Sequence, residues 1–165
     1  MSPVQSAVKR SLDVTASLAG IVVLSPLMIA IAIAIRWGSP GPVLFRQSRV
    51  GKKMRPFDIL KFRTMVVDAD RQGPPLTAGD DPRITGVGRW LRKTKLDELP
   101  QLFNVFRGDM SLVGPRPEVP KYVEMMRDEF EPVLIVRPGL TDLASIKYRD
   151  ESELLSQSED PEHEY

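Results

Sequence analysis

The sequence has 165 residues, enough for one domain with a buried core. Its 23 basic and 22 acidic residues nearly cancel, which predicts no general affinity for nucleic acid. It has no cysteine and one histidine, His163, so disulfides and thiol nucleophiles are excluded, and zinc clusters and histidine-based triads nearly so. Acid–base or nucleophilic chemistry would have to use carboxylates, Lys, Tyr, Ser or Thr.

The charges are unevenly distributed along the chain. Residues 1–63 contain ten Lys or Arg and two acids, whereas residues 148–165 contain seven acids and one Arg. A basic first half beside an acidic tail predicts contact with an anionic surface or a phosphate-bearing substrate near the N-terminal half.

Residues 14–35 form a run of twenty-two residues without a charge. A helix that crosses a membrane needs roughly 20 such residues, so the length fits. A cleaved signal peptide fits less well, because the run is too long and no small-residue cleavage site follows it. A buried helix of a soluble protein is the alternative, although an uncharged run of this length is rare in so small a domain.

Ser25 and Pro26 lie within this run and predict a helix-break-helix membrane segment over residues 1–38. Proline removes a backbone donor and bends a helix, and a serine hydroxyl can satisfy the freed carbonyl. Basic residues flank the run on both sides, and the positive-inside bias places both flanks in the cytoplasm: Lys9, Arg10, Arg36, Arg46, Arg49, Lys52, Lys53 and Arg55. We therefore expect a re-entrant helix that enters and leaves one leaflet. A bent spanning helix stays the alternative.

Residues 39–150 are expected to form a small cytoplasmic or interfacial domain of short amphipathic helices and a β-hairpin, which makes the fold class α+β. Two runs of β-type residues, 43–47 and 57–62, flank a Gly-Lys-Lys turn and predict the hairpin. Polar residues with Gly and Pro predict a loop over 68–82.

The second half of this domain is expected to be mainly helical. Leucines and phenylalanines at helical spacing predict an amphipathic helix over 95–107 that ends near Gly108. The remaining predicted elements are an extended turn around Arg116, a helix over 119–135, a turn over 137–141 and an acidic tail over 151–165.

Asp97 and Glu98 stand side by side at the start of the predicted helix over 95–107. A structural role is open, because Thr94 and Asp97 have the spacing of a capping box and the helix dipole favours acids in a first turn. Their surroundings favour chemistry instead. Carboxylates among basic residues suit a site where a divalent cation meets phosphate oxygens, and the nearby basic residues are Arg92, Lys93, Lys95, Arg107 and Arg116.

Other basic side chains are candidates for binding phosphate. Arg116 lies between two prolines, which stiffen the turn that presents its guanidinium. A turn with a salt bridge from Arg116 to Glu118 is the structural alternative. Lys61 and Arg63 are two residues apart and would share one face of a strand, as a ligand site or as a solvated basic face near the membrane. Arg137, in the motif RPGLT, is a binding candidate or part of a turn.

Five segments occur in an order that resembles the small monotopic phosphoglycosyl transferases, a group of bacterial sugar transferases: KRSLDVTASLAGIVVLSPL, GPVLFRQSRVG, FDILKFRTM, LRKTKLDELPQLFNVFRGDMSLVGPRPE and RPGLT. The resemblance runs from about residue 9 to residue 141. It implies a re-entrant, monotopic enzyme on the cytoplasmic leaflet of the bacterial inner membrane. Such enzymes move a sugar 1-phosphate from a UDP-sugar to polyprenol (undecaprenyl) phosphate and release UMP, at the first membrane step of glycan or glycoconjugate assembly.

The resemblance also implies roles for single residues. Asp97 would be the nucleophile that forms a covalent phosphosugar intermediate and would bind Mg²⁺, with Glu98 as its dyad partner. Ser25 and Pro26 match the break in the re-entrant helix. Arg116 falls on the family's phosphate-binding arginine and Arg92 on a basic residue before the dyad. The candidates for binding substrate phosphates are therefore Arg116, Arg92, Lys61 and Arg137.

Two other classes of protein stay open. A non-catalytic module could grip anionic lipid with its basic face, although such an anchor would not need acids within a basic zone. A soluble Mg²⁺-dependent phosphotransferase would bury the N-terminal helix. Formation of a homo-oligomer is also open.

Overall fold

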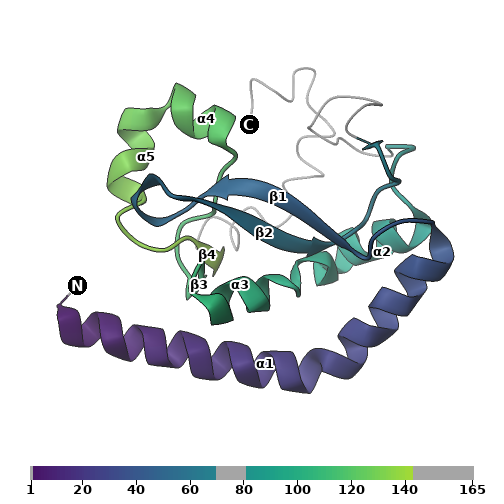
Figure 1. Ribbon diagram of the computed structural model, residues 1–165, viewed down its shortest axis with the longest axis horizontal. Helices are drawn as coiled ribbons and strands as arrows, with labels where there is room; N and C mark the ends of the chain where they lie inside the picture. Colours follow the sequence, from purple (N-terminus) through teal and green to yellow (C-terminus); the bar gives the residue numbers. More distant parts are fainter. Residues whose placement is uncertain (1, 70–80, 143–165) are drawn as a thin grey trace.

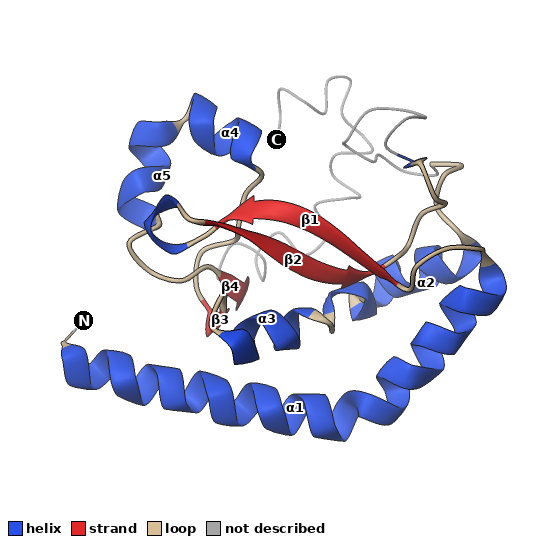
Figure 2. Ribbon diagram, viewed as in Figure 1, coloured by secondary structure: helices blue, strands red, loops and turns tan. Residues whose placement is uncertain are grey.

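The computed structural model describes residues 2–69 and 81–142. They form a mixed α+β fold in which one long N-terminal helix lies under a small domain, which confirms the predicted fold class (Figures 1 and 2). The elements in chain order are helix α1 (Pro3–Gly38), strand β1 (Leu44–Val50), the 3₁₀ turn η1 (Lys52–Met54), strand β2 (Pro56–Phe62), helix α2 (Gly86–Thr94), the 3₁₀ turn η3 (Leu96–Glu98), helix α3 (Gln101–Arg107), strand β3 (Ser111–Val113), helices α4 (Pro120–Met125) and α5 (Arg127–Val133), and strand β4 (Gly139–Thr141).

Helix α1 is one continuous element, so the predicted helix-break-helix segment is corrected to a single helix that contains Ser25 and Pro26. Figure 1 shows α1 as a long arm that bends into a second, rising arm. The Ser25 hydroxyl donates to the carbonyl of Val22 at 2.8 Å. Because the missing N–H of Pro26 leaves this carbonyl free, the serine compensates for the proline, as predicted.

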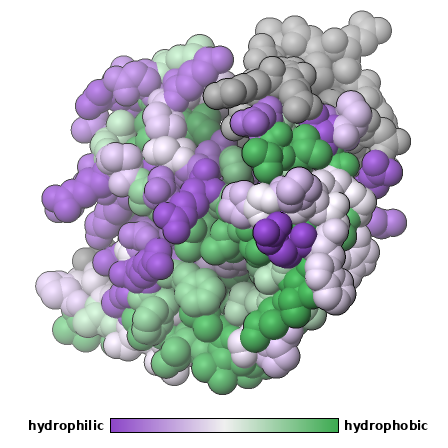
Figure 3. All heavy atoms as spheres, turned by 45° about the vertical axis from the view of Figure 1, so that its right-hand side comes forward, coloured by the Kyte–Doolittle hydropathy of each residue, from purple (hydrophilic) through white to green (hydrophobic). Residues whose placement is uncertain are grey.

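One side of α1 packs on the domain and the other side is exposed. Met28, Ile31 and Ile35 are buried together with Phe62 of β2 and Leu91 of α2. By length and composition α1 could cross a membrane, with a mean hydropathy of 2.7 over an 18-residue window that is 17% buried. In Figure 3 apolar surface gathers along the bottom of the molecule, where α1 lies. The exposed apolar residues of α1 are Val4, Val8, Leu12, Leu18, Val22, Val23, Leu27, Ile29, Ile33 and Trp37.

The part of α1 before Pro26 is fastened to the domain by a buried acid. Asp13 is 3% exposed and accepts hydrogen bonds from the Ser111 hydroxyl at 2.9 Å and the Leu112 N–H at 3.1 Å. Lys9 lies 2.6 Å from Asp13 and also donates to Ser111. Lys9 and Arg10, which were expected to flank the apolar segment, are therefore part of α1 itself. Lys9 contacts Ser111 of β3.

Arg10 provides a second contact between the same part of α1 and the domain. Its guanidinium donates to the carbonyls of Val105 and Phe106 at 2.7 and 2.8 Å. These carbonyls end α3, where a cation is favoured by the helix dipole. Since the part of α1 after Pro26 packs on β2 and α2, both parts of the helix contact one domain.

The predicted β-hairpin is confirmed, with β1 and β2 antiparallel and Leu44 opposite Phe62. Strand β1 continues to Val50, beyond the predicted run over 43–47. Asn104 of α3 is fully buried behind the hairpin and pairs with the edge of β2. Its side chain accepts from the Leu60 N–H at 3.0 Å and donates to the Asp58 carbonyl at 2.8 Å, which fixes α3 on the sheet.

The predicted helix over 95–107 is wrong as a single element. Lys95 has a left-handed backbone, with φ 56°, and separates α2 from η3. A second helix, α3, then begins at Gln101. Apolar residues three apart suit a 3₁₀ turn as well as an α-helix, so their spacing could not distinguish η3 from α3. Thr94 ends α2 and does not form the capping box considered for Asp97, because its hydroxyl donates backwards to the carbonyl of Trp90 at 2.9 Å.

Two further predictions are corrected near the C-terminal end of the described chain. The helix expected over 119–135 consists of α4 and α5, because Met126 between them has φ −121° and ψ 42°. The turn expected over 137–141 includes β4, which pairs parallel with β3. A Cβ on Gly139 would lie 2.2 Å from the backbone nitrogen of Gly114, so the close approach of these segments requires glycine. The tail over 151–165 and most of the loop over 68–82 lie outside the described residues.

Candidate functional site

A cavity of about 460 Å³ lies between the hairpin, α2, η3 and the segment after β3. Residues from these four elements that the sequence singled out line the cavity together: Lys61, Arg92, Asp97, Glu98 and Arg116. The break after α2 makes this possible, because η3 turns the chain so that both acids face the basic residues. Arg137 is not among the described residues that line the cavity, and its guanidinium donates to the Gly108 carbonyl at 2.8 Å. Its assignment to phosphate binding stays a prediction.

Asp97 is a buried carboxylate that is 8% exposed. Its Oδ1 atom is buried without a hydrogen-bond partner among the described residues. Burial raises the pKa of Asp97 above its usual value, and the charge of Glu98 adds to this, whereas Lys61 and Arg92 act against it. A buried carboxylate oxygen that the protein leaves without a partner is available to a ligand or a reaction centre.

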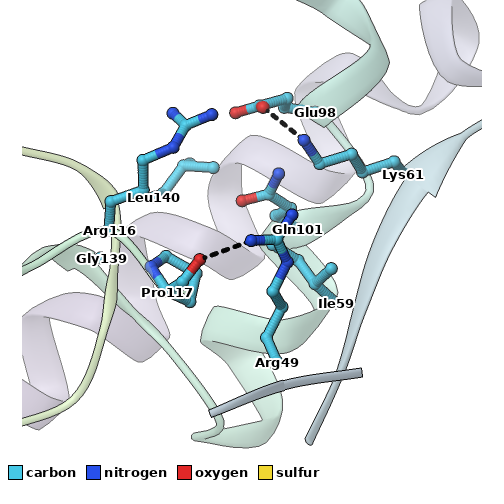
Figure 4. Close-up of a pocket in the computed structure, with 9 residues that line it drawn as sticks. All are labelled: Arg49, Ile59, Lys61, Glu98, Gln101, Arg116, Pro117, Gly139 and Leu140. Carbon is cyan, nitrogen blue, oxygen red and sulfur yellow. Dashed lines mark hydrogen bonds and ion pairs between the residues drawn. The ribbon is translucent and has the colours of Figure 1, made fainter. Parts of the chain in front are cut away.

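Glu98, the neighbouring acid, is in the opposite electrostatic situation. Its carboxylate accepts from Lys61 Nζ at 2.8 Å (Figure 4). Burial alone would raise the pKa of Glu98, but Lys61, Arg116 and Lys95 together hold it below its usual value. The two adjacent acids therefore have pKa values shifted in opposite directions. An ion pair with Lys61 holds Glu98 as an anion, whereas burial raises the pKa of Asp97.

Arg92 and Thr64 form the wall of the cavity beside Asp97. Arg92 Nε donates to the Thr64 hydroxyl at 3.0 Å. Burial lowers the pKa of Arg92, and the charges of Asp97 and Asp81 oppose that shift. Thr64 was not predicted as a site residue, because its contact with Arg92 joins positions 28 residues apart.

The turn that carries Arg116 is held from several directions. The Arg116 N–H donates to the Asp142 carboxylate at 3.0 Å, and the Pro115 carbonyl accepts from the Gly139 N–H at 2.8 Å. Figure 4 shows the Arg116 guanidinium extending toward Glu98. Arg116 is exposed, so a ligand in the cavity can reach it. The predicted extended turn is therefore confirmed as a fixed support for this side chain.

Arg49 of β1 fastens this turn to the hairpin. Its guanidinium donates to the Pro117 carbonyl at 3.1 Å and to Glu118 Oε2 at 3.3 Å, and to Gln47 Oε1 at 2.8 Å. Glu118, considered above as a partner of Arg116, thus pairs with Arg49. Both side chains are largely buried, with 16% and 14% of their surface exposed. Sequence patterns identified Arg49 only as a basic flank of the apolar segment, since its partner lies 69 residues away.

A small hollow of about 20 Å³ lies beside Arg49, and Lys61 also lines it (Figure 4). Gln101, which is 2% exposed, lines it together with Glu98 and Arg116. A space of this size fits about one water molecule with polar neighbours.

The residues fit a magnesium ion only in combination with substrate oxygens. Within residues 2–69 and 81–142, three or more His, Cys, Asp or Glu side chains that could hold a metal do not come together. Mg²⁺ binds readily to one or two carboxylates when phosphates and water supply the other ligands. The unpaired Oδ1 of Asp97, in a cavity lined by basic side chains, is the donor that fits this arrangement.

Replacing Asp97 by Asn is expected to raise the melting temperature at neutral pH. Because the folded-state pKa of Asp97 is raised above its unfolded value, the ionised carboxylate destabilises the fold above the folded pKa. This cost is absent below the unfolded pKa of about 3.9, so the gain should shrink as pH falls. Thermal unfolding of the detergent-solubilised protein across this pH range measures it.

The neighbouring substitution Glu98→Gln is the matched control and should lower the melting temperature at neutral pH. The folded-state pKa of Glu98 is lowered, so its stabilisation is present above the unfolded pKa and is lost as pH falls through the folded pKa. Shifts of the same sign for the two variants at neutral pH would contradict this description of the dyad.

Replacing Arg49 by Ala is expected to destabilise the fold by roughly 3 kcal/mol, because the largely buried Glu118 carboxylate would lose the guanidinium that pairs with it at 3.3 Å. The control is Arg127→Ala, whose ion pair with Glu124 is 3.5 Å long and mostly exposed, with an expected cost of about 0–1 kcal/mol. Equal changes in the free energy of unfolding would show that the Arg49 contact does not support the Arg116 turn.

Comparison with known proteins places the chain in a family. Residues 4–165 match the family model described as bacterial sugar transferase. The chain is 45% identical over 148 residues to UDP-N-acetylgalactosamine-undecaprenyl-phosphate N-acetylgalactosaminephosphotransferase of Aeromonas hydrophila, over 88% of this chain and 35% of that protein. It is 39% identical over 163 residues to UDP-glucose:undecaprenyl-phosphate glucose-1-phosphate transferase of Escherichia coli K12, over 96% of this chain and 35% of that protein.

A third relative carries the name of another sugar. The chain is 40% identical over 158 residues to undecaprenyl-phosphate galactose phosphotransferase of Salmonella typhimurium, over 87% of this chain and 33% of that protein. This chain thus spans about a third of the length of each of these three relatives. The family model covers nearly all of its 165 residues, so the chain belongs to the bacterial sugar transferase family.

Proposed function

We propose that this protein transfers a sugar 1-phosphate from a UDP-sugar to undecaprenyl phosphate, or a similar polyprenyl phosphate, and releases UMP. The observation that carries the proposal is the buried Oδ1 of Asp97, which has no hydrogen-bond partner among the described residues and lies in a cavity lined by basic side chains. The names of the relatives agree on undecaprenyl phosphate as the acceptor and differ in the sugar. They support the class of reaction and leave the sugar to be identified.

Asp97 is proposed to act as the nucleophile. Its carboxylate oxygen attacks the phosphorus that carries the sugar, and the bond from this phosphorus to the oxygen bridging to UMP breaks. The result is an aspartyl phosphosugar and free UMP. A phosphate oxygen of the polyprenyl phosphate then attacks the same phosphorus and releases Asp97. The raised pKa of Asp97 makes its carboxylate a stronger nucleophile once it is ionised, and one site serves the soluble and the lipid substrate in turn.

The basic residues would neutralise the charge of the substrate phosphates. Lys61, Arg92 and Arg116 line the same cavity as Asp97, and charge neutralisation and positioning account for most of the catalysis of phosphoryl transfer. Mg²⁺, held by Asp97 together with substrate oxygens, would polarise the diphosphate. Glu98 was expected to help deprotonate the acceptor or to position the site. Its lowered pKa makes it a weak base, so we propose that it positions Lys61.

The same proposal includes a re-entrant topology, with the catalytic domain on the cytoplasmic face of the inner membrane. The two parts of α1 on either side of Pro26 both contact the same domain, through Asp13 and Arg10 before it and through Ile31 and Ile35 after it. A straight spanning helix of 36 residues would be about 54 Å long and would place its ends on opposite sides of a bilayer. Contacts of both parts with one domain support a helix that returns to the leaflet it entered.

The two alternative classes explain less of the site. A lipid-binding anchor gives no reason to bury the Asp97 carboxylate, because a buried acid weakens the attraction of basic residues for anionic lipid. A soluble phosphotransferase would cover the apolar side of α1, which is exposed over the length of the helix in this structure.

Asp97→Asn is expected to abolish UMP release, by at least about 10³-fold, because an amide is not a nucleophile at this centre. The assay measures UMP from a panel of UDP-sugars with undecaprenyl phosphate and Mg²⁺, using protein in detergent micelles. Glu98→Gln should lose less activity, because Lys61 remains. Retention of most activity by Asp97→Asn would refute the assignment of the nucleophile.

Topology is tested with single cysteines, which the natural sequence lacks. Ser6→Cys lies in the first part of α1 and Ser48→Cys on β1, and both serines are exposed. In oriented membrane vesicles, a membrane-impermeant thiol reagent should label both cysteines from the cytoplasmic side only. Labelling of the two positions from opposite sides would establish a spanning helix.

A further inference from the structure

The lining of the cavity divides into two walls of different chemistry. The charged wall that the proposed function uses consists of Lys61, Arg92, Asp97, Glu98 and Arg116. The other charged residues that line the cavity are Arg49, Arg63, Asp68 and Lys95. The apolar wall consists of Pro42, Phe45, Met65, Val66 and Val67. Reaction at a sugar diphosphate makes no use of this second wall.

The apolar wall is assembled from two segments that pack against each other. Pro42 and Phe45 lie just after α1, and Met65 to Val67 follow β2. Gly41 packs so closely on Val67 that an added Cβ would lie 2.5 Å from its Cγ2. Phe45 and Val67 are nevertheless 38% and 47% exposed. Apolar side chains this exposed beside a charged site are a typical feature of a binding surface.

This wall begins where the exposed apolar side of α1 ends. Ile33 and Trp37, in the last turns of α1, are 45% and 87% exposed, and Pro42 follows five residues after Trp37. If α1 lies in the membrane, Pro42 and Phe45 follow its exposed apolar end in the chain and line the same cavity as the charged wall.

We infer that the apolar wall binds the first isoprene units of the polyprenyl phosphate acceptor, while its phosphate lies on the charged wall. The inference rests on the proposed function. A ligand with an anionic head and an apolar tail matches a cavity with one basic and one apolar side, and the UDP-sugar has no such tail. Phe45 and Val67 are thus acceptor-binding residues that determine which lipid phosphate reaches Asp97.

The test uses the double variant Phe45→Ser, Val67→Ser in the full chain. Leu44→Ser is the matched control, because Leu44 is 37% exposed on the same strand and does not line the cavity. Two reactions are measured separately: release of UMP from the UDP-sugar without acceptor, and transfer to undecaprenyl phosphate over a range of acceptor concentrations.

The double variant is expected to raise the KM for undecaprenyl phosphate by at least about tenfold, while UMP release without acceptor stays within about twofold of the wild type. Leu44→Ser should change neither. An acceptor KM equal to that of Leu44→Ser overturns the inference. A rise in the KM for the UDP-sugar instead would assign the wall to the nucleotide and would also overturn it.

If the wild type releases no UMP from any UDP-sugar, the proposed function fails and the inference is judged by binding. Geranyl phosphate and inorganic phosphate are then titrated into the wild type and the double variant. A loss of at least about tenfold in affinity for geranyl phosphate alone supports the apolar wall as a prenyl site. Equal affinities of the two proteins for geranyl phosphate refute it.

Discussion

The candidate site is built around the contrast between two adjacent carboxylates, Asp97 and Glu98. Lys61 pairs with Glu98 at 2.8 Å and holds that acid as an anion, whereas Asp97 is buried with an oxygen that receives no hydrogen bond among the described residues. Burying a carboxylate with one oxygen that receives no hydrogen bond costs folding free energy, which the rest of the fold has to offset. Lys61 and Arg92 offset part of this cost electrostatically, and η3, between α2 and α3, holds Asp97 near them.

Helix α1 contributes directly to that support. Asp13 and Arg10 of α1 hold β3 and the end of α3, and β3 leads straight into the turn that carries Arg116. Arg49 and Gly139 fix the same turn from the hairpin and from β4. The candidate cavity therefore forms between elements that α1 ties together.

Sequence patterns identified the residues that line this cavity better than they identified the helices and turns that carry those residues. Asp97, Glu98 and Arg116 occur in dense local motifs, and the serine that compensates for Pro26 followed from local helix chemistry. Helix α2 was missed because it contains two glycines and few apolar residues, and the spacing of leucines did not reveal the left-handed Lys95. Arg49 and Thr64 could not be assigned, because their partners are 69 and 28 residues away and only the fold brings them together.

The central claim is that Asp97 forms a bond to the phosphosugar, and mass spectrometry of the acid-quenched protein tests it most directly. The protein is incubated with a UDP-sugar and Mg²⁺ in the absence of acceptor, then digested. The account predicts that the peptide containing Asp97 gains the mass of one sugar phosphate, and that adding undecaprenyl phosphate before the quench removes it. Transfer to the acceptor with no such adduct, or with an adduct on another residue, would contradict the account.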